Sequence, residues 1–267
     1  MVSRTDTRQS RVILTMKWGD LFPPEYVNVL YNACRRHLTG EFRFACLTDD
    51  KAGLVPEIET YPIPDLGLDA DMWRKGAWPK LGVFQRDLYG LSGRALFIDL
   101  DMAICGSLDP FFDHPAGFLT TDMGDDWRPK PSGKAPREAG TCIFAFDLGH
   151  ESQIIDRFVA DRQAAVRRHV IEQNWVGAHA SSMDYWPDGW VISFKRWLRR
   201  PIGIDLFLPP KPPPSNVKVL AFHGNPRPAD LLRPGNRRWD TLPHLGHGQV
   251  RWLADYWREN GGTLLVS

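Results

Sequence analysis

The first half of the chain alternates short apolar runs with segments of helical spacing. Arg11–Met16 and Phe42–Thr48 are apolar runs of strand length, and a shorter extended piece is expected near residues 57–63. Between the first two runs, a pair of prolines at 23–24 opens a predicted helix whose apolar positions recur at helical spacing as far as Leu38. This part of the chain therefore predicts a strand, a helix and a second strand.

A second unit of the same kind follows. Apolar residues at helical spacing predict a helix from about Lys80 to Leu91, Gly93 ends it, and the apolar run Ala95–Ile98 predicts a buried strand. Strands that alternate with helices are joined by right-handed crossovers and form a largely parallel sheet. We therefore expect an α/β fold with a Rossmann-like, mixed but mainly parallel sheet, in which ligands bind at the carboxyl ends of the strands.

The second half of the chain predicts further strands and helices around one long polar loop. The loop spans 124–140, is rich in proline and glycine, and lies between two predicted strands. A loop of this length is typical of a lid or a binding segment, and surface disorder explains it equally well. The predicted strands are 117–121, 141–146 and 217–222, and the predicted helices are 151–168, 173–179 and 248–260.

Composition narrows the class of protein. The 267 residues suit one or two domains, and 43% hydrophobic with 24% charged residues is typical of a globular chain, which excludes a disordered or fibrous one. The 33 basic and 32 acidic residues leave a formal charge of +1, so the chain as a whole carries no field that would hold nucleic acid or an anionic membrane. Any anionic ligand has to be bound locally.

The cysteines and the start of the chain bear on location. The four cysteines form no C-x-x-C pair, which argues against a zinc knuckle or a disulfide framework and favours a reducing compartment. The start, MVSRTDTRQS, has no apolar core of signal-peptide length, and no apolar run approaches the ~20 residues that cross a bilayer. These observations predict a cytoplasmic protein.

The strand Ala95–Ile98 delivers two carboxylates to its carboxyl end. Asp99 and Asp101 are two residues apart, so both can point into the ligand crevice, where they repel each other. A divalent cation resolves this repulsion and keeps coordination sites for water and phosphate oxygens. The pair indicates a metal that holds a diphosphate, although D-x-D triplets are common by chance and a polar strand end explains the pair as well.

A histidine follows the predicted strand at 217–222. His223 precedes Gly224, which permits close backbone approach, and Arg227, which can pair with phosphate. Two carboxylate oxygens and one imidazole nitrogen suit Mn²⁺. Taken alone, the histidine is as well explained by a structural hydrogen bond.

The order of these motifs resembles that of the metal-dependent glycosyltransferases with the GT-A fold, in particular family 8, which includes glycogenin and bacterial lipopolysaccharide galactosyltransferases. The resemblance covers most of the chain and implies a single GT-A domain over residues 1–267. Its nucleotide-sugar and metal-binding half would span about 11–122, its acceptor-side half about 138–230, and a C-terminal helix about 240–260. The segments that carry it are VILTMKWGD, WPKLGVFQ, FIDLDM, EAGTCIFAFD, EQNWV and FHGNPRP.

The resemblance implies a transferase that moves a hexose from a nucleotide-diphosphate sugar, with UDP as the expected nucleotide, to a glycan or lipid-linked acceptor, with retention of anomeric configuration. Mn²⁺ or Mg²⁺ is the expected cofactor, and bacterial polysaccharide biosynthesis is the expected setting. Asp99, Asp101 and His223 would hold the metal. The residues implied in catalysis are Gln173, Lys80 and Asp101, and those implied in donor binding are Thr15, Lys17, Trp18, Asp49, Asp50, Lys80, Asp99, Gly224 and Arg227.

Two segments depart from the family pattern and keep alternatives open. Family members often carry Asn-Ala-Gly where this chain has Glu-Ala-Gly at 138–140, and Asp-Gln-Asp where it has Glu-Gln-Asn at 172–174. A sugar-nucleotide-binding protein with weak turnover or none is therefore one alternative. A haloacid-dehalogenase-type phosphatase is another, since its D-x-D also ends a strand and the acidic pair at 125–126 could imitate its own, but Ala103 stands where that motif normally has Thr or Val. A nucleotidyltransferase is disfavoured because KWGDLFPP lacks the usual glycine-rich, basic signature.

The predicted C-terminal helix has an apolar stripe. The stripe is formed by Val250, Leu253, Ala254 and Trp257. Docking against the core is the favoured use, and a weak contact with a membrane surface is the alternative, reinforced by Arg233, Arg237 and Arg238. The second use would place the protein at the inner face of a membrane, near a lipid-linked acceptor. No nucleic-acid partner is expected.

Overall fold

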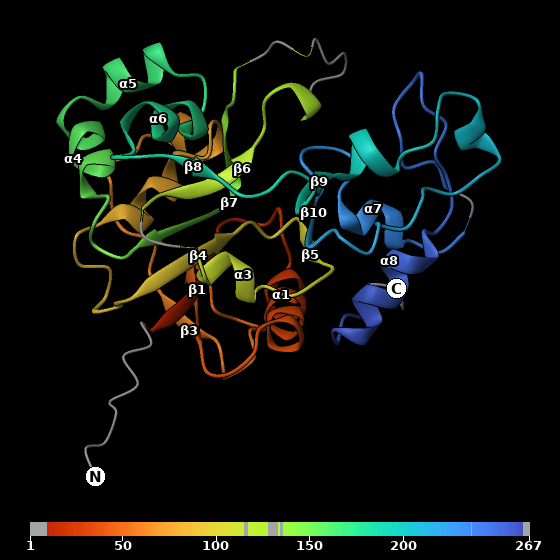
Figure 1. Ribbon diagram of the computed structural model, residues 1–267, viewed down its shortest axis with the longest axis horizontal. Coiled ribbons are helices and arrows are strands. Elements are labelled where there is room, and N and C mark those ends of the chain that lie inside the picture. Colours follow the sequence, from red (N-terminus) through yellow and green to blue (C-terminus); the bar gives the residue numbers. More distant parts are fainter. Residues whose placement is uncertain (1–9, 115–116, 128–132, 134–135, 236, 264–267) are drawn as a thin grey trace.

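The computed structural model describes residues 10–114, 117–127, 133, 136–235 and 237–263. Part of the predicted loop at 124–140 lies outside the described residues, so its expected role as a lid or binding segment stays a prediction. In Figure 1 the chain forms a twisted sheet covered by helices, and its C-terminal part, coloured cyan to blue, lies to one side of that sheet.

The main sheet has seven strands in the order β3-β2-β1-β4-β7-β6-β8. The first four of these are parallel, β7 is antiparallel to both of its neighbours, and β8 is parallel to β6. This arrangement confirms the expected α/β fold with a mixed, mainly parallel sheet. The strands are β1 (Arg11–Lys17), β2 (Arg43–Thr48), β3 (Glu59–Tyr61), β4 (Arg94–Ile98), β6 (Leu119–Asp122), β7 (Ala139–Asp147) and β8 (Asp184–Tyr185).

A second sheet of three short strands begins directly after the paired aspartates. β5 (Met102–Ile104) runs antiparallel to β10 (Val219–Ala221), which in turn is parallel to β9 (Val191–Ser193). The segment Asp99–Asp101 therefore joins the two sheets. β5 and β9 were not predicted, because three residues are too few to display the alternation that identifies a strand.

Helices cover both faces of the main sheet (Figure 1). Ile13 of β1 belongs to the core that contains α1, whereas Val12 and Leu14 belong to the core that contains η1, α4 and α6. This alternation follows from the two-residue period of a strand that is buried on both faces. The helical elements are α1 (Pro24–His37), α2 (Ala70–Arg74), η1 (Trp78–Phe84), α3 (Asp109–Phe112), η2 (Asp125–Trp127), α4 (Ser152–Ala160), α5 (Arg162–Arg168), α6 (Glu172–His179), η3 (Phe194–Leu198), η4 (Ile204–Leu206), α7 (Pro228–Leu232) and α8 (Arg251–Glu259).

Two predicted helices are wrong in form. The segment at 80–91 contains a 3₁₀-helix, η1, followed by turns, and every residue of η1 is buried. Its apolar spacing of three residues fits the three-residue turn of a 3₁₀-helix as well as it fits an α-helix. The predicted helix at 151–168 is two helices, α4 and α5. Asp161 breaks it with φ of −153° and caps α5, because its carboxylate accepts a hydrogen bond from the Ala164 amide at 2.9 Å.

The C-terminal helix α8 docks against the core. Trp257 packs edge-on against Tyr26 of α1, with ring centroids 4.8 Å apart, and its indole N–H donates to the Glu25 carboxylate at 2.8 Å. Leu253 and Ala254 of the apolar stripe are buried as well. The stripe is thus used for packing, and a membrane contact through this helix is not supported. Across the described residues, no helix combines the length and the apolarity that crossing a membrane requires.

Candidate functional site

Polar residues gather at one edge of the main sheet, where the parallel strands end. Lys17 ends β1, Asp49 follows β2 and Asp99 follows β4 at this edge. β7 runs in the opposite direction and begins at the same edge, and the Asp99 amide donates to the Cys142 carbonyl of β7 at 2.9 Å. The carboxyl ends of the strands therefore form the edge at which the sequence predicted a ligand site.

Lys80 of η1 is buried between two carboxylates at this edge. Its ammonium lies 3.0 Å from the Asp99 carboxylate and 3.2 Å from that of Glu172, and it donates to the Thr141 carbonyl at 2.8 Å. The Lys80 and Glu172 side chains are only 7% and 4% exposed. The hydroxyl of Thr141 donates to Glu172. These charged groups form one network, which we call the Lys80 network: Lys80, Asp99 and Glu172.

Burial and charge act in opposite directions on the Lys80 network. Burial lowers the pKa of Lys80, but the charges of Asp99 and Glu172 outweigh it, so the pKa lies above its ordinary value and the ammonium stays charged. Burial raises the pKa of Asp99 and of Asp101, against the opposing effect of Lys80, and the Asp101 charge raises that of Asp99 further. Within the Lys80 network one ammonium faces two carboxylates, so negative charge remains for neighbouring cations or for a bound metal ion.

The second sheet brings His223 to the same place. The amide of Phe222, which directly follows β10, donates to the Asp101 carbonyl at 3.0 Å, so His223 lies beside the Asp99–Asp101 segment. Nε2 of His223 is 2.7 Å from the hydroxyl of Ser193, which ends β9 and is fully buried. This hydrogen bond fixes the orientation of the imidazole and leaves its Nδ1 for another partner.

The surroundings of His223 keep its imidazole neutral. Burial lowers its pKa, and the charges of Lys195, Arg196 and Arg199 lower it further, to about 4. The imidazole ring also packs against the indole of Trp127, with ring centroids 5.4 Å apart. A neutral imidazole is the form that binds a metal or accepts a hydrogen bond.

Two more cations face Asp101. The ammonium of Lys195 lies 3.2 Å from the position that a Cβ on Gly224 would occupy, and Gly224 has φ of +68°, so glycine is required here. Arg227 precedes α7, with its guanidinium 5.5 Å from the ring centroid of Phe22. The charges of Arg227 and Lys195 oppose the effect of burial on the Asp101 pKa, which places both near that carboxylate.

Two residues expected in donor binding contact backbone carbonyls within the protein. Thr15 is fully buried and its hydroxyl donates to the Ile98 carbonyl at 2.8 Å, which ties β1 to the end of β4. Lys17 is 5% exposed, and its ammonium lies 3.5 Å from the Gly19 carbonyl. Both residues lie at the site edge, and their expected part in donor binding stays a prediction.

Other expected donor residues surround a separate hollow at the ends of β2 and β3. The Asp49 carboxylate accepts a hydrogen bond from the Gly19 amide at 2.8 Å, and the Trp18 indole donates to the Trp73 carbonyl at 3.2 Å. The hollow has a volume of about 570 Å³ and is lined in part by Asp49, Asp50 and Trp73. The loop after β1 is thus tied to the loop after β2, as a shared binding surface requires.

Gln173 lies in the first turn of α6, directly after Glu172 of the Lys80 network. The Glu172 amide donates to the Gly76 carbonyl at 2.8 Å, which fixes the start of α6 against the segment before η1. The Gln173 side chain is half-buried and makes no hydrogen bond to another described residue. Its amide is therefore available to a ligand, and its expected place beneath the anomeric carbon stays a prediction.

The expected metal ligands lie on adjoining segments. Among the residues that the structure describes, no three His, Cys, Asp or Glu side chains are arranged to hold a metal ion, so Asp99, Asp101 and His223 are not assembled as a three-ligand centre. Asp99 and Asp101 nevertheless fit a hard divalent cation, because both supply oxygen donors. Burial raises the pKa of each carboxyl group, so a bound cation would stabilise the ionised form. Phosphate and water oxygens would complete such a coordination sphere, and the metal role of these residues stays a prediction.

Three residues of the site were missed by sequence reasoning. Glu172 was noted only as a departure from a family pattern, and its contact with Lys80 spans 92 positions of sequence. Ser193 ends β9, a strand too short to be predicted, and Lys195 follows it in η3. The sequence signal for Lys195 as a site residue was a basic residue shortly after a three-residue apolar run. This pattern is too common in proteins to identify Lys195.

Comparison with known proteins gives matches among solved structures. No family model and no curated protein matches this chain. The galactosyltransferase LgtC, in complex with donor and acceptor sugar analogs, is 12% identical with a TM-score of 0.60, and the match covers 96% of each chain. The bifunctional glycosyltransferase WbbM is 11% identical with a TM-score of 0.58, over 96% of this chain and 50% of that one. GlyE from Streptococcus pneumoniae TIGR4 is 10% identical with a TM-score of 0.56, over 96% and 62%.

A likeness at such low identity establishes the fold. This chain spans nearly all of LgtC but about half the length of WbbM. The matched proteins are glycosyltransferases, so the phosphatase and nucleotidyltransferase alternatives gain no support from them. The motif order that resembled the GT-A enzymes is confirmed at the level of architecture: the chain has the GT-A fold of these glycosyltransferases.

Proposed function

We propose that the protein is a glycosyltransferase that moves a hexose from a nucleotide-diphosphate sugar, with UDP as the nucleotide, to a glycan or lipid-linked acceptor. One observation carries the proposal: the Lys80 network, Asp101, His223, Lys195 and Arg227 converge where the two sheets meet. The fold shared with LgtC, which was solved with donor and acceptor sugar analogs, supports it. Carboxylates that can bind a metal ion, next to cations that can bind phosphate, suit a ligand that carries both a diphosphate and a metal.

The chemistry follows from the charge that develops on the leaving group. As the bond between the anomeric carbon and the diphosphate oxygen breaks, its electron pair moves to the β-phosphate. Lys195 and Arg227 would stabilise that charge, each by a few kcal/mol in a site with little water. The acceptor hydroxyl forms the new bond to the anomeric carbon, and its proton passes to the departing phosphate oxygen.

A divalent metal fits the two aspartates. Asp99 and Asp101 would hold Mn²⁺ or Mg²⁺, with the neutral imidazole of His223 beside them as the third protein ligand. When bound, the metal would supply Lewis-acid stabilisation of the diphosphate leaving group.

The Lys80 network would orient the sugar. Lys80 is held in place by its two carboxylate partners, and Gln173 follows Glu172 with a side-chain amide that makes no hydrogen bond to another described residue. The Gln173 amide oxygen is suited to support positive charge at the anomeric carbon as the leaving group departs. Such support on the face opposite the acceptor is consistent with retention of configuration.

The nucleoside would bind in the hollow at the ends of β2 and β3. Asp49 and Asp50 supply hydrogen-bond acceptors there, and Trp73 contributes an aromatic wall. A carboxylate that accepts from ribose hydroxyls and an aromatic wall beside the base are the contacts that a nucleoside requires.

Calorimetric titration with UDP and with GDP, each with Mn²⁺ and with chelator, tests the proposal. We expect metal-dependent binding of UDP, slow hydrolysis of UDP-hexoses, and loss of both in Asp101→Asn. Asp156→Asn is the matched control, because Asp156 is an exposed carboxylate on α4 that is 4.0 Å from Arg86. If neither nucleotide binds to the folded protein, the proposal is wrong.

A binding protein without turnover is the second candidate. The observation that favours it is that the Glu172 side chain is only 4% exposed and is held by Lys80 and Thr141, so little of its carboxylate is accessible to a sugar hydroxyl. Tight UDP binding with no hydrolysis or transfer of any tested UDP-hexose would support this candidate over the enzyme.

A further inference from the structure

Positive charge is concentrated in one part of the chain. Residues 195–251 contain eleven of the 33 Lys and Arg but only three of the 32 Asp and Glu. The near-neutral total therefore hides a surplus of eight positive charges in this part, balanced by a negative surplus elsewhere. In Figure 1 it forms the region beside the main sheet, in cyan and blue.

The same part exposes apolar side chains to solvent. Of the eleven large hydrophobic residues that are exposed among those described, seven lie between 197 and 242, and five fall within 202–208. Phe207 is 80% exposed and Ile202 is 59% exposed. The other four are scattered singly over the chain, which is ordinary for a soluble surface. A cluster of this kind within so short a stretch marks an interaction surface.

Buried polar contacts hold the stretch 202–208 in this position. The Asp205 side chain is 4% exposed, and its carboxylate accepts hydrogen bonds from the amides of Gly203 at 2.9 Å and Leu245 at 2.7 Å. His247 Nε2 lies 2.7 Å from the Leu206 carbonyl. Because Asp205 turns inward, the apolar side chains around it turn outward.

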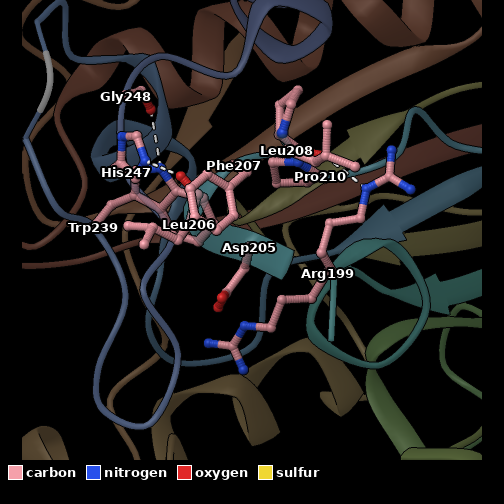
Figure 2. Close-up of a pocket in the computed structure, with 12 residues that line it drawn as sticks. Arg199, Asp205, Leu206, Phe207, Leu208, Pro210, Trp239, His247 and Gly248 are labelled. Atoms are coloured by element: carbon pink, nitrogen blue, oxygen red, sulfur yellow. Dashed lines mark hydrogen bonds between the residues drawn. The ribbon is translucent and has the colours of Figure 1, made fainter. Parts of the chain in front are cut away.

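A pocket with an apolar wall lies under the exposed side chains. Figure 2 shows Leu206, Phe207 and Leu208 around it, together with Trp239 and His247. Its volume is about 180 Å³. The pocket is far smaller than a nucleotide sugar requires, and its wall suits an aliphatic chain end.

Cations border the apolar cluster. Lys211 is exposed, and its amide donates to the Leu198 carbonyl at 2.9 Å, which closes the loop that contains residues 202–208. Arg237 and Arg238 are exposed as well; Arg238 donates to the His244 carbonyl at 3.1 Å, and the Gly248 amide donates to the Arg237 carbonyl at 2.9 Å. Both arginines thus lie on the loop that packs on Asp205 and Leu206.

We propose that residues 202–208 with Lys211, Arg237 and Arg238, here called the basic apolar surface, bind the protein to an anionic lipid bilayer. Isoleucine, leucine and phenylalanine tips enter the boundary between headgroups and acyl chains, and the neighbouring cations pair with lipid phosphates. A polyanion such as nucleic acid would use the cations but would gain nothing from the exposed aliphatic tips. None of the residues of this surface belongs to α8 or to the residues assigned to the transferase site.

Sedimentation of the full chain with lipid vesicles tests the proposal. We expect binding to vesicles of phosphatidylcholine mixed with phosphatidylglycerol, and little binding to phosphatidylcholine alone. Lys211→Gln with Arg237→Gln should weaken binding roughly 25-fold, since each cation near an anionic surface contributes about fivefold. Ile202→Ser with Phe207→Ser should weaken it about tenfold or more, because the inserted apolar area is lost.

Val170→Ser is the matched control for the apolar variant, because Val170 is 85% exposed and lies outside the basic apolar surface. Both double variants should keep the thermal unfolding of the parent, since the changed side chains are exposed. The proposal fails if anionic vesicles do not bind the parent, or if Ile202→Ser with Phe207→Ser binds them as well as the control does. It also fails if heparin binds the parent and the vesicles do not. UDP binding is not used in this test, so its outcome is independent of the transferase proposal.

Discussion

At the scale of single residues, the site depends on one buried lysine that holds two carboxylates, the buried Glu172 and the partly exposed Asp99. Asp99 was predictable because it ends an apolar run, and Lys80 because its segment resembles a family motif. Glu172 was not, since a glutamate at the start of a helix is usually solvated. Its 4% exposure follows from a partner far away in the sequence. Removing one member of such a group leaves an unpaired charge out of water, which costs more than the pair contributes.

Lys80→Met should therefore destabilise the fold by about 3–5 kcal/mol. The loss should be at least about 1 kcal/mol smaller when Lys80→Met is made in a Glu172→Gln background, because one of the two stranded charges is then absent. Urea unfolding of the four proteins in the cycle measures both quantities. Lys75→Met, at an exposed lysine just before η1, is the control and should stay within about 0.5 kcal/mol of the parent. Equal losses in both backgrounds would contradict a direct contact.

Lys195 gives a second prediction at this scale. If it stabilises the leaving diphosphate, Lys195→Met should reduce kcat for transfer or donor hydrolysis by about 10²–10³-fold with a smaller change in nucleotide affinity. Lys195→Arg should restore part of the rate, because it keeps the charge. Lys211→Met removes a lysine outside the site and should leave the rate of hydrolysis of a soluble donor unchanged. A Lys195→Met enzyme with the parent's kcat would remove Lys195 from the mechanism.

At the scale of elements, the predictions succeeded where periodicity extends over several residues and failed where it does not. The strands β1, β2 and β4 were found because each places at least five residues in a buried run. The single helix expected at 151–168 was wrong. An aspartate at position 161 does not rule out a continuous helix, but in the structure Asp161 is the N-cap of a second helix, α5. Strands of three residues, such as β9, gain their form from their neighbours rather than from their own pattern.

The turn at 203–206 carries a prediction of pH dependence. Burial raises the pKa of Asp205, but hydrogen bonds from the Leu245 amide, His244 and the Gly203 amide outweigh it and lower the pKa below its ordinary value. A carboxylate whose pKa is lower in the folded than in the unfolded chain stabilises the fold above the unfolded pKa, near 4, and that stabilisation is lost as the pH falls through the folded value. Asp205→Asn should therefore cost about 1–2 kcal/mol at neutral pH.

This cost should shrink as the pH falls below about 4, because protonation makes the parent resemble the variant. Urea unfolding of both proteins over a pH series measures the difference. Asp71→Asn is the control, since Asp71 is an exposed carboxylate with a single partner three residues away, Arg74. A difference that stays constant down to the lowest pH at which the chain folds would mean that Asp205 acts through shape alone.

At the scale of the whole molecule, the site exists because two sheets meet at the Asp99–Asp101 segment. The main sheet could be predicted from local pattern, and it brings Lys80 and Asp99 together. The second sheet pairs residues more than a hundred positions apart, Ala221 with Met102 among them, and only that pairing brings His223 and Lys195 to the aspartates. No local pattern contains this information, so the sequence could suggest the members of the site but not their assembly.

A ligand that bridges the two sheets should stabilise the whole chain. UDP with Mn²⁺ at about a hundred times its dissociation constant should add about 2.7 kcal/mol to the free energy of unfolding, which raises Tm by about 5–10 °C in a chain of this size. Thermal unfolding followed by circular dichroism measures the shift, with chelator as the first control. Asp101→Asn and His223→Ala should both lose the shift, because the ligand is expected to contact Asp101 on the main sheet's side of the junction and His223 on the side of β10. Without ligand, both variants should still unfold cooperatively. A shift that survives in His223→Ala but not in Asp101→Asn would confine the ligand to the main sheet, and the second sheet would then have no part in donor binding.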